Sequence, residues 1–68
     1  MDQDEFAELR EELSALMPHR KVESIDEVDD HIEVFFKTGG HPIDIQEERQ
    51  TKMLVFQILT KTAIVKVC

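Results

Sequence analysis

The stretch HIEVFFKTGGHPIDIQ, residues 31–46, decides the fold that we expect for this chain. A Gly-Gly pair is typical of a two-residue type I′ β-turn, because both central positions of that turn need a positive φ. A turn at Gly39-Gly40 pairs Phe36 with Ile43 and Val34 with Ile45, and strand alternation places all four side chains on one face. The turn register and the apolar pattern agree, so they predict a β-hairpin.

A helix competes with the first half of this hairpin. Ser24-Ile25-Asp26-Glu27 has the spacing of a capping box, in which serine and glutamate bind each other's backbone N–H groups. A helix over 25–36 explains the first apolar group of the hairpin but not residues 41–45. We therefore expect the hairpin, with only a short helical turn near 25–29.

The firmest helix signal lies at the start of the chain, over residues 3–17. Apolar side chains recur there at spacings of three and four and form one stripe: Phe6, Leu9, Leu13, Leu16 and Met17. Acids at its beginning complement the helix dipole, and Pro18 ends it.

The last third of the chain is more apolar. Residues 47–52 are polar and predict a loop or a first helical turn, and the short apolar run Met53–Leu59 favours a central strand. A buried helix beginning near Asp44 or Gln46 remains an alternative. Residues 60–62 then form a turn and Ala63–Cys68 a last strand. The fold class is α+β: one domain over 1–68, with an N-terminal amphipathic helix packed on a small antiparallel sheet of three to four strands.

Charge divides the chain into two unlike halves. Residues 1–33 hold twelve acids against three bases, net −9, and residues 34–68 hold five bases against three acids, net +2. An acidic half repels a phosphate backbone, so direct nucleic-acid binding is not expected, but it attracts a basic protein surface. We expect a non-catalytic interaction domain whose acidic N-terminal half docks on a basic partner, using these acids: Glu8, Glu11, Glu12, Asp26, Asp29, Asp30 and Glu33. Small acidic inhibitors that imitate nucleic-acid charge, many encoded by phages and mobile elements, share this composition.

The apolar C-terminal half supports a second interpretation. One helix cannot cover both faces of the predicted sheet, so a second copy of the chain is the simplest cover, and we expect a homodimer. The residues expected at that interface are Val55, Leu59, Ile64, Val65 and Val67.

Catalytic and metal chemistry have weak signals. Cys68 ends the chain and no nucleophile elbow is present, so we expect neither an enzyme nor a cofactor. A small metal-responsive regulator using His31 or His41 with nearby carboxylates is the least favoured alternative, because the spacing matches no common metal motif. One cysteine, no signal-peptide pattern and no apolar run near the ~20 residues of a membrane span predict a cytoplasmic location without membrane contact.

Overall fold

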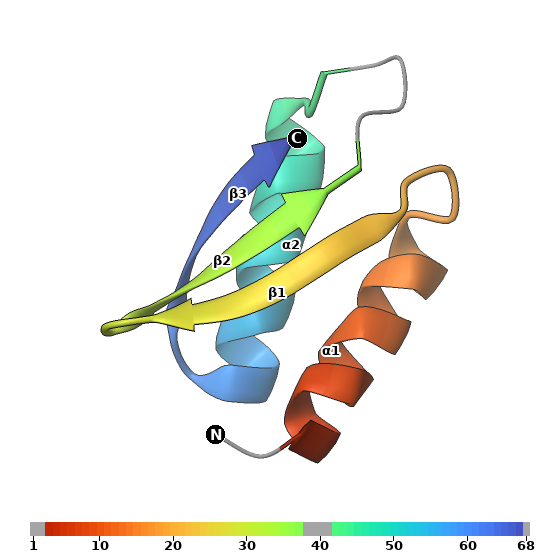
Figure 1. Ribbon diagram of the computed structural model, residues 1–68. Helices are drawn as coiled ribbons and strands as arrows, with labels where there is room; N and C mark the ends of the chain where they lie inside the picture. Colours follow the sequence, from red (N-terminus) through yellow and green to blue (C-terminus); the bar gives the residue numbers. More distant parts are fainter. Residues whose placement is uncertain (1–2, 38–41, 68) are drawn as a thin grey trace.

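The described part of the chain forms two helices and three strands, in the order α-β-β-α-β (Figure 1). The computed structural model describes residues 3–37 and 42–67. The elements are α1 (Gln3–Leu16), β1 (Val22–Val28), β2 (His31–Phe36), α2 (Ile45–Leu59) and β3 (Thr62–Val67). The predicted α+β class is confirmed, and so are the helix and the last strand at the two ends of the described chain. Cys68, assigned to that last strand, lies outside the described residues.

The sheet is mixed, not antiparallel as the sequence analysis predicted. Its strand order is β1-β2-β3, with β1 and β2 antiparallel and β2 and β3 parallel. A tight turn at Asp29-Asp30 joins the antiparallel pair. Between β2 and β3 the chain passes through α2, which returns it to the same end of the sheet, and such a crossover gives parallel strands.

The predicted partner of residues 31–36 is wrong, although those residues do form a strand. Phe36 pairs with Val22 on one side and Val67 on the other, so β2 is the central strand and both its edges are occupied. No edge is left for Ile43 or Ile45, and Ile45 instead begins α2. The predicted turn at Gly39-Gly40 itself lies outside the described residues.

A β-bulge explains why β1 was not predicted. The short helical turn expected near 25–29 and the competing helix over 25–36 are both wrong, since Val22–Val28 is a strand. Its apolar residues Val22 and Ile25 are three apart, a spacing that places them on opposite faces of a regular strand. The register shifts between Val22 and Ser24, and as a result Val22 and Ile25 both pack against the core. The bulge thus turns a helix-like spacing into a strand with one apolar face.

The apolar run Met53–Leu59 is part of a helix, so the predicted central strand is wrong and the alternative helix is confirmed. Asp44 caps α2: its side chain accepts a hydrogen bond from Glu47 N–H, and the Glu47 side chain accepts one from Asp44 N–H. Helical geometry spreads the run around the axis. Val55 is fully buried, whereas Met53 is 61% and Phe56 59% exposed.

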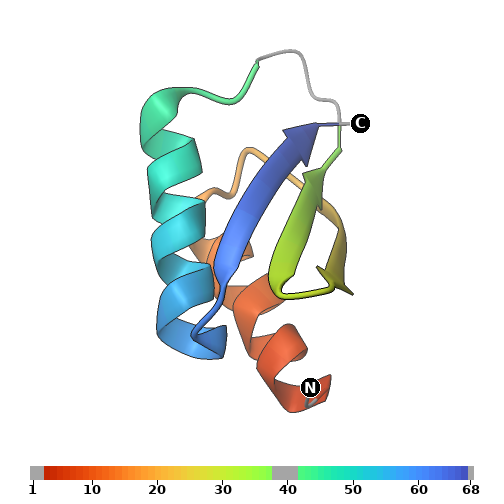
Figure 2. The ribbon, with the colours of Figure 1, turned by 90° about the vertical axis from the view of Figure 1, so that its left-hand side faces the viewer.

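Both helices cover one face of the sheet and leave the other open (Figures 1 and 2). The core between helices and sheet consists of Leu9, Leu13, Met17, Ile32, Val34, Phe36, Val55, Leu59 and Ala63. Along β2, buried residues alternate with half-buried ones, as expected when only one face is covered. A chain with a one-sided core has a small stability margin, about 3–5 kcal/mol for domains of this size.

The end of α2 stores local strain. Thr60 has φ 57° and ψ 40°, left-handed values that disfavour a β-branched residue by about 1–2 kcal/mol. We expect Thr60→Gly to raise the free energy of unfolding by roughly 0.5–1 kcal/mol and the melting temperature by about 2–8 °C. Thr60→Asn should give a smaller gain, because asparagine tolerates this region better than threonine. Thermal unfolding followed by circular dichroism measures both.

The control is Thr62→Gly, two residues on at the start of β3, which should lower the melting temperature because glycine weakens a strand. A melting temperature that falls in Thr60→Gly contradicts the assignment of strain to Thr60.

Candidate functional site

The outer surface of α1 is strongly acidic. The helix holds five acids, Asp4, Glu5, Glu8, Glu11 and Glu12, against Arg10, a net charge of −4. Leu9 and Leu13, one turn apart, face the core, so Glu8, Glu11 and Glu12 are left exposed on the other sides of the helix. Within residues 3–37 and 42–67, none of the five acids forms an ion pair. We call the five the acidic helix surface.

The other predicted acids lie elsewhere. Asp26 pairs with Glu33 across β1 and β2, and both lie on the open face of the sheet, opposite the buried side of β2. Glu33 contacts Lys66 at 3.5 Å and His31 at 3.4 Å. Asp29 and Asp30 are exposed at the β1–β2 turn, which Figure 1 shows at the far end of the sheet from α1. The seven predicted acids are therefore spread over three surfaces: the helix, the turn and the open sheet face.

Two acids of the sheet, Glu27 and Glu33, are paired with lysines from the second half of the chain. Lys61 donates a 2.9 Å hydrogen bond to Glu27, which lowers the pKa of Glu27. Lys66 lies between Glu33 and the ring of Phe35, 5.6 Å from its centroid. These contacts connect β3 and its preceding turn to β1 and β2. Glu23, Asp26 and Asp29 form no ion pair among the described residues, so β1 and its turn keep part of their negative charge, as α1 does.

A groove of about 470 Å³ runs between α1 and α2 on the outer side of the helix pair. We call it the helix groove, and its lining is Glu12, Ala15, Leu16, Gln50, Met53, Leu54 and Gln57. Its floor is apolar: Leu16 is 43% and Met53 61% exposed, and Leu54 is half-buried. Because Glu12 belongs to both, the acidic helix surface forms one wall of the helix groove. Sequence reasoning missed this groove because it placed Met53–Leu59 in a strand.

A second hollow lies on the other side of α2, against β3. It is lined by Lys52, Met53, Phe56, Lys61, Thr62 and Ala63. Its two lysines are already paired, Lys52 with Glu48 at 3.6 Å and Lys61 with Glu27. Met53 therefore separates the helix groove, where Glu12 has no ion-pair partner among the described residues, from a hollow whose two lysines are paired.

The predicted oligomer-interface residues divide between core and surface. Val55 and Leu59 are 0% and 7% exposed inside the core, and Val65 is partly buried against it. Their own chain covers them, which follows from the helical geometry of α2. Ile64 and Val67 remain 43% and 40% exposed on β3, an edge strand of the sheet.

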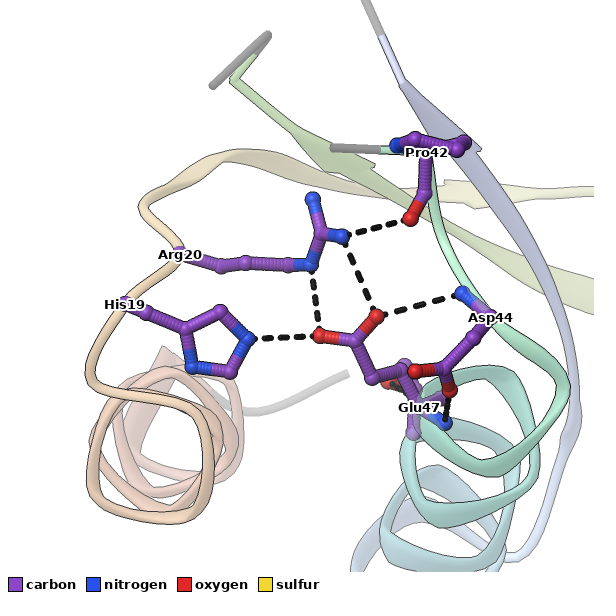
Figure 3. A network of polar contacts seen from close by, with 6 residues as sticks. His19, Arg20, Pro42, Asp44 and Glu47 are labelled. Atoms are coloured by element: carbon purple, nitrogen blue, oxygen red, sulfur yellow. Dashed lines mark hydrogen bonds and ion pairs between the residues drawn. The ribbon is translucent and has the colours of Figure 1, made fainter. Parts of the chain in front are cut away.

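A buried ion-pair network joins the start of β1 to the start of α2 (Figure 3). Arg20 donates from Nε to Glu47 Oε2 at 2.7 Å and from Nη2 to Glu47 Oε1 at 3.1 Å. The same Nη2 donates to the Pro42 carbonyl at 2.8 Å. His19 Nε2 lies 2.7 Å from Glu47 Oε2, although its own side chain is 59% exposed. Arg20 and Glu47 are 6% and 8% exposed, so water contributes little to their solvation.

This network is structural in character, because both carboxylate oxygens of Glu47 accept hydrogen bonds from within the chain. The hydrogen bonds from Arg20, the largest cause, lower the pKa of Glu47 to about 2, and the hydrogen bond to Glu47 raises the pKa of Arg20. Among the described residues no buried side-chain nitrogen or oxygen lacks a partner. The sequence carries no local signal for a pair 27 residues apart. The capping-box spacing from Asp44 to Glu47, which the sequence analysis did not use, is a signal for one member.

The arrangement of the described residues does not support the hypothesis of a metal-responsive regulator. The part of the chain that the structure describes brings no three His, Cys, Asp or Glu side chains together as a metal site. His31 contacts Glu33 and Asp30, and His41 lies outside the described residues. In those same described ranges, neither helix has the length and apolar character needed to cross a membrane.

Three comparisons with known proteins find no match: none to a protein-family model, none to a curated protein and none to a solved structure. Geometry, burial and charge therefore carry the functional conclusion.

The lowered pKa of Glu47 predicts acid sensitivity. Since the folded chain holds this pKa at about 2 against an ordinary value of 4.5, the unfolded chain binds the proton first as pH falls. The stabilisation by Glu47 is thus complete above pH ~5 and is lost as pH falls from there toward 2. Urea unfolding at a series of pH values should show the free energy of unfolding falling over this window.

Variants separate Glu47 from the other acids. Glu47→Gln leaves Arg20 buried without its charge partner, a change that typically costs about 3–5 kcal/mol, so it should be barely folded at pH 7. Arg20→Lys keeps the charge but not the two-point contact, and should fold with reduced stability and a shallower acid slope. Glu48→Gln, in the neighbouring surface pair, should keep the wild-type profile. An unchanged acid slope in Arg20→Lys contradicts this account.

Proposed function

We propose that this chain is a non-catalytic protein–protein interaction domain that binds a basic surface of another protein through α1. The observation that carries the proposal is the net charge of −4 on α1, a single helix whose five acids form no ion pair among the described residues. Uncompensated charge of one sign on a rigid element accelerates association with an oppositely charged surface. Like charges on one helix repel one another and destabilise the folded chain, and a role in binding accounts for their presence.

The spacing of these acids supports a particular kind of partner. From Asp4 to Glu12 the helix rises about 12 Å, at 1.5 Å per residue. Five carboxylates over that length give about one charge per 3 Å, close to the 3.4 Å per phosphate of a single DNA strand. A protein surface that binds nucleic acid fits this charge density, and an inhibitor that occupies such a surface is the specific form of the proposed function.

Charge reversal on α1 tests the proposal. We expect Glu8→Lys/Glu11→Lys to lose the partners that the wild-type chain retains from an extract of its native host, because both side chains are exposed and unpaired. Binding by the wild type should weaken steeply between low and high salt, since exposed charges are screened beyond ~10 Å at 0.1 M. Quantitative mass spectrometry of the captured proteins, followed by titration of the purified partner, measures both effects.

The matched control is Asp29→Lys/Asp30→Lys, which changes the net charge by the same amount at the β1–β2 turn, away from α1. If the partners depend on α1, this variant retains them. Equal loss in both variants assigns the effect to net charge, and capture that is insensitive to salt and to both changes overturns the proposal.

A second candidate function is homo-oligomeric assembly through β3. Ile64 and Val67 are exposed on an edge strand, and an edge strand offers backbone N–H and C=O groups to another chain. This candidate predicts association at micromolar concentration that is insensitive to salt and is lost in Ile64→Lys. Sedimentation velocity distinguishes the cases, and a monomer at high concentration removes this candidate.

A further inference from the structure

The helix groove has a shape that can accept a third helix. It lies between two neighbouring helices of 14 and 15 residues, each about 21 Å long at 1.5 Å per residue. Side chains at spacings of three and four on a docking helix form a stripe that fits such a furrow. The lining covers residues 12–16 of α1 and 50–57 of α2, about 6 Å and 10 Å of helix, so about two turns of a docking helix contact the groove.

The floor of the groove supplies apolar contact that its own chain does not use. Met53 and Leu16 are large side chains exposed by 61% and 43%, and Leu54 is half-buried beside them. Clustered exposure of this kind marks interaction surfaces more often than scattered single residues do. Methionine adapts its shape to different partners and is frequent where helices are bound.

The walls of the groove determine the charge of the occupant. Glu12 lines one wall, and Glu8 and Glu11 extend the same negative potential along α1. Gln50 and Gln57 line the α2 wall with neutral amides. Lys52 and Lys61 line the other hollow and are paired with Glu48 and Glu27, and Arg49, exposed one turn before Met53 on α2, is not part of the groove lining. Nothing in the lining attracts an acidic occupant.

We propose that the helix groove binds a basic amphipathic helix of a partner protein, with its apolar stripe on Leu16, Met53 and Leu54 and its basic side chains toward Glu12 and Glu8. The proposal rests on the proposed function and specifies the partner element. A second copy of the chain is the less suitable occupant, because each copy has a net charge of −7 and its lysines beside Met53 are already paired.

Methionine methyl groups report directly on the groove. The sequence has three methionines; Met53 lies in the groove floor and Met17 is 2% exposed in the core. Labelling with ¹³C-methyl methionine gives a signal at the site and one away from it, assigned with Met53→Leu and Met17→Leu. The probes are three 18-residue helical peptides: basic with a leucine stripe, equally basic with the stripe replaced by glutamine, and acidic with the leucine stripe.

We expect the basic leucine-stripe peptide to shift the Met53 signal and to leave the Met17 signal in place. Glu12→Lys should weaken this binding about five- to tenfold, as expected for reversing one exposed charge contact. Glu48→Lys makes the same charge change outside the groove lining and should weaken binding by no more than about threefold. Leu16→Asn should weaken binding through the floor alone, and thermal unfolding verifies that each variant is folded.

Other outcomes overturn the groove proposal in distinguishable ways. Salt-dependent peptide binding that leaves Met53 unshifted removes the groove but preserves the proposed function of α1. Equal Met53 shifts from the basic glutamine peptide or the acidic peptide remove the amphipathic, basic occupant. A Met53 signal that shifts with protein concentration in the absence of peptide shows that a second copy of the chain occupies the groove. Failure of every basic peptide to bind at low salt contradicts both proposals.

Discussion

The buried ion pair between Arg20 and Glu47 holds the two halves of this small fold in register. Arg20 lies in the loop between α1 and β1, and Glu47 lies in the first turn of α2, so two hydrogen bonds connect this loop to the start of α2. A third, to the Pro42 carbonyl, fixes the segment that enters α2. Replacing a buried ion pair with apolar groups is often neutral for stability, so we infer that this pair serves mainly to specify one arrangement of the helices. It determines where α2 starts relative to α1, and with it the line along which the helix groove lies.

The same pair compensates for a core that covers only one face of the sheet. A chain of 68 residues without a disulfide buries little apolar surface, and α1 and α2 pack against the same side of β2. The capping box at Asp44 and the contacts of Glu47 share one carboxylate, so the start of α2 is anchored by its own backbone and by Arg20 together. Local and long-range constraints therefore agree at this residue, as expected of a sequence that specifies one fold.

What the sequence predicted depended on whether a pattern was local. The stripe of α1, the strand at 31–36 and the last strand were all predicted, because each pattern completes itself within one element. The parallel pairing of β3 was not, since the apolar run 53–59 suits a buried strand and a helix equally until its neighbours are known. Nor was β1, because a bulge at Val22–Ser24 gave it a helical spacing.

The candidate site followed the same division. The exposed acids of α1 were predicted, since they share a helix whose inward stripe is clear from the sequence. The grouping of those acids with Asp26 and Glu33 required knowing that β1 and β2 pair and which face the helices cover. The helix groove required α2 itself, and the pair of Arg20 with Glu47 required the whole fold.

The division of charge along the sequence changes its meaning once the chain is folded. An acidic first half and a mildly basic second half suggested two separate surfaces, but among the described residues ion pairs with Lys or Arg connect the halves: Arg20 with Glu47, Glu27 with Lys61, and Glu33 with Lys66. Lys52 pairs with Glu48 within α2. The five acids of α1 form no ion pair among the described residues, and one of them, Glu12, stands at the edge of an apolar groove. Negative charge beside exposed apolar surface is the combination that a basic amphipathic partner satisfies, and neither property alone would select it.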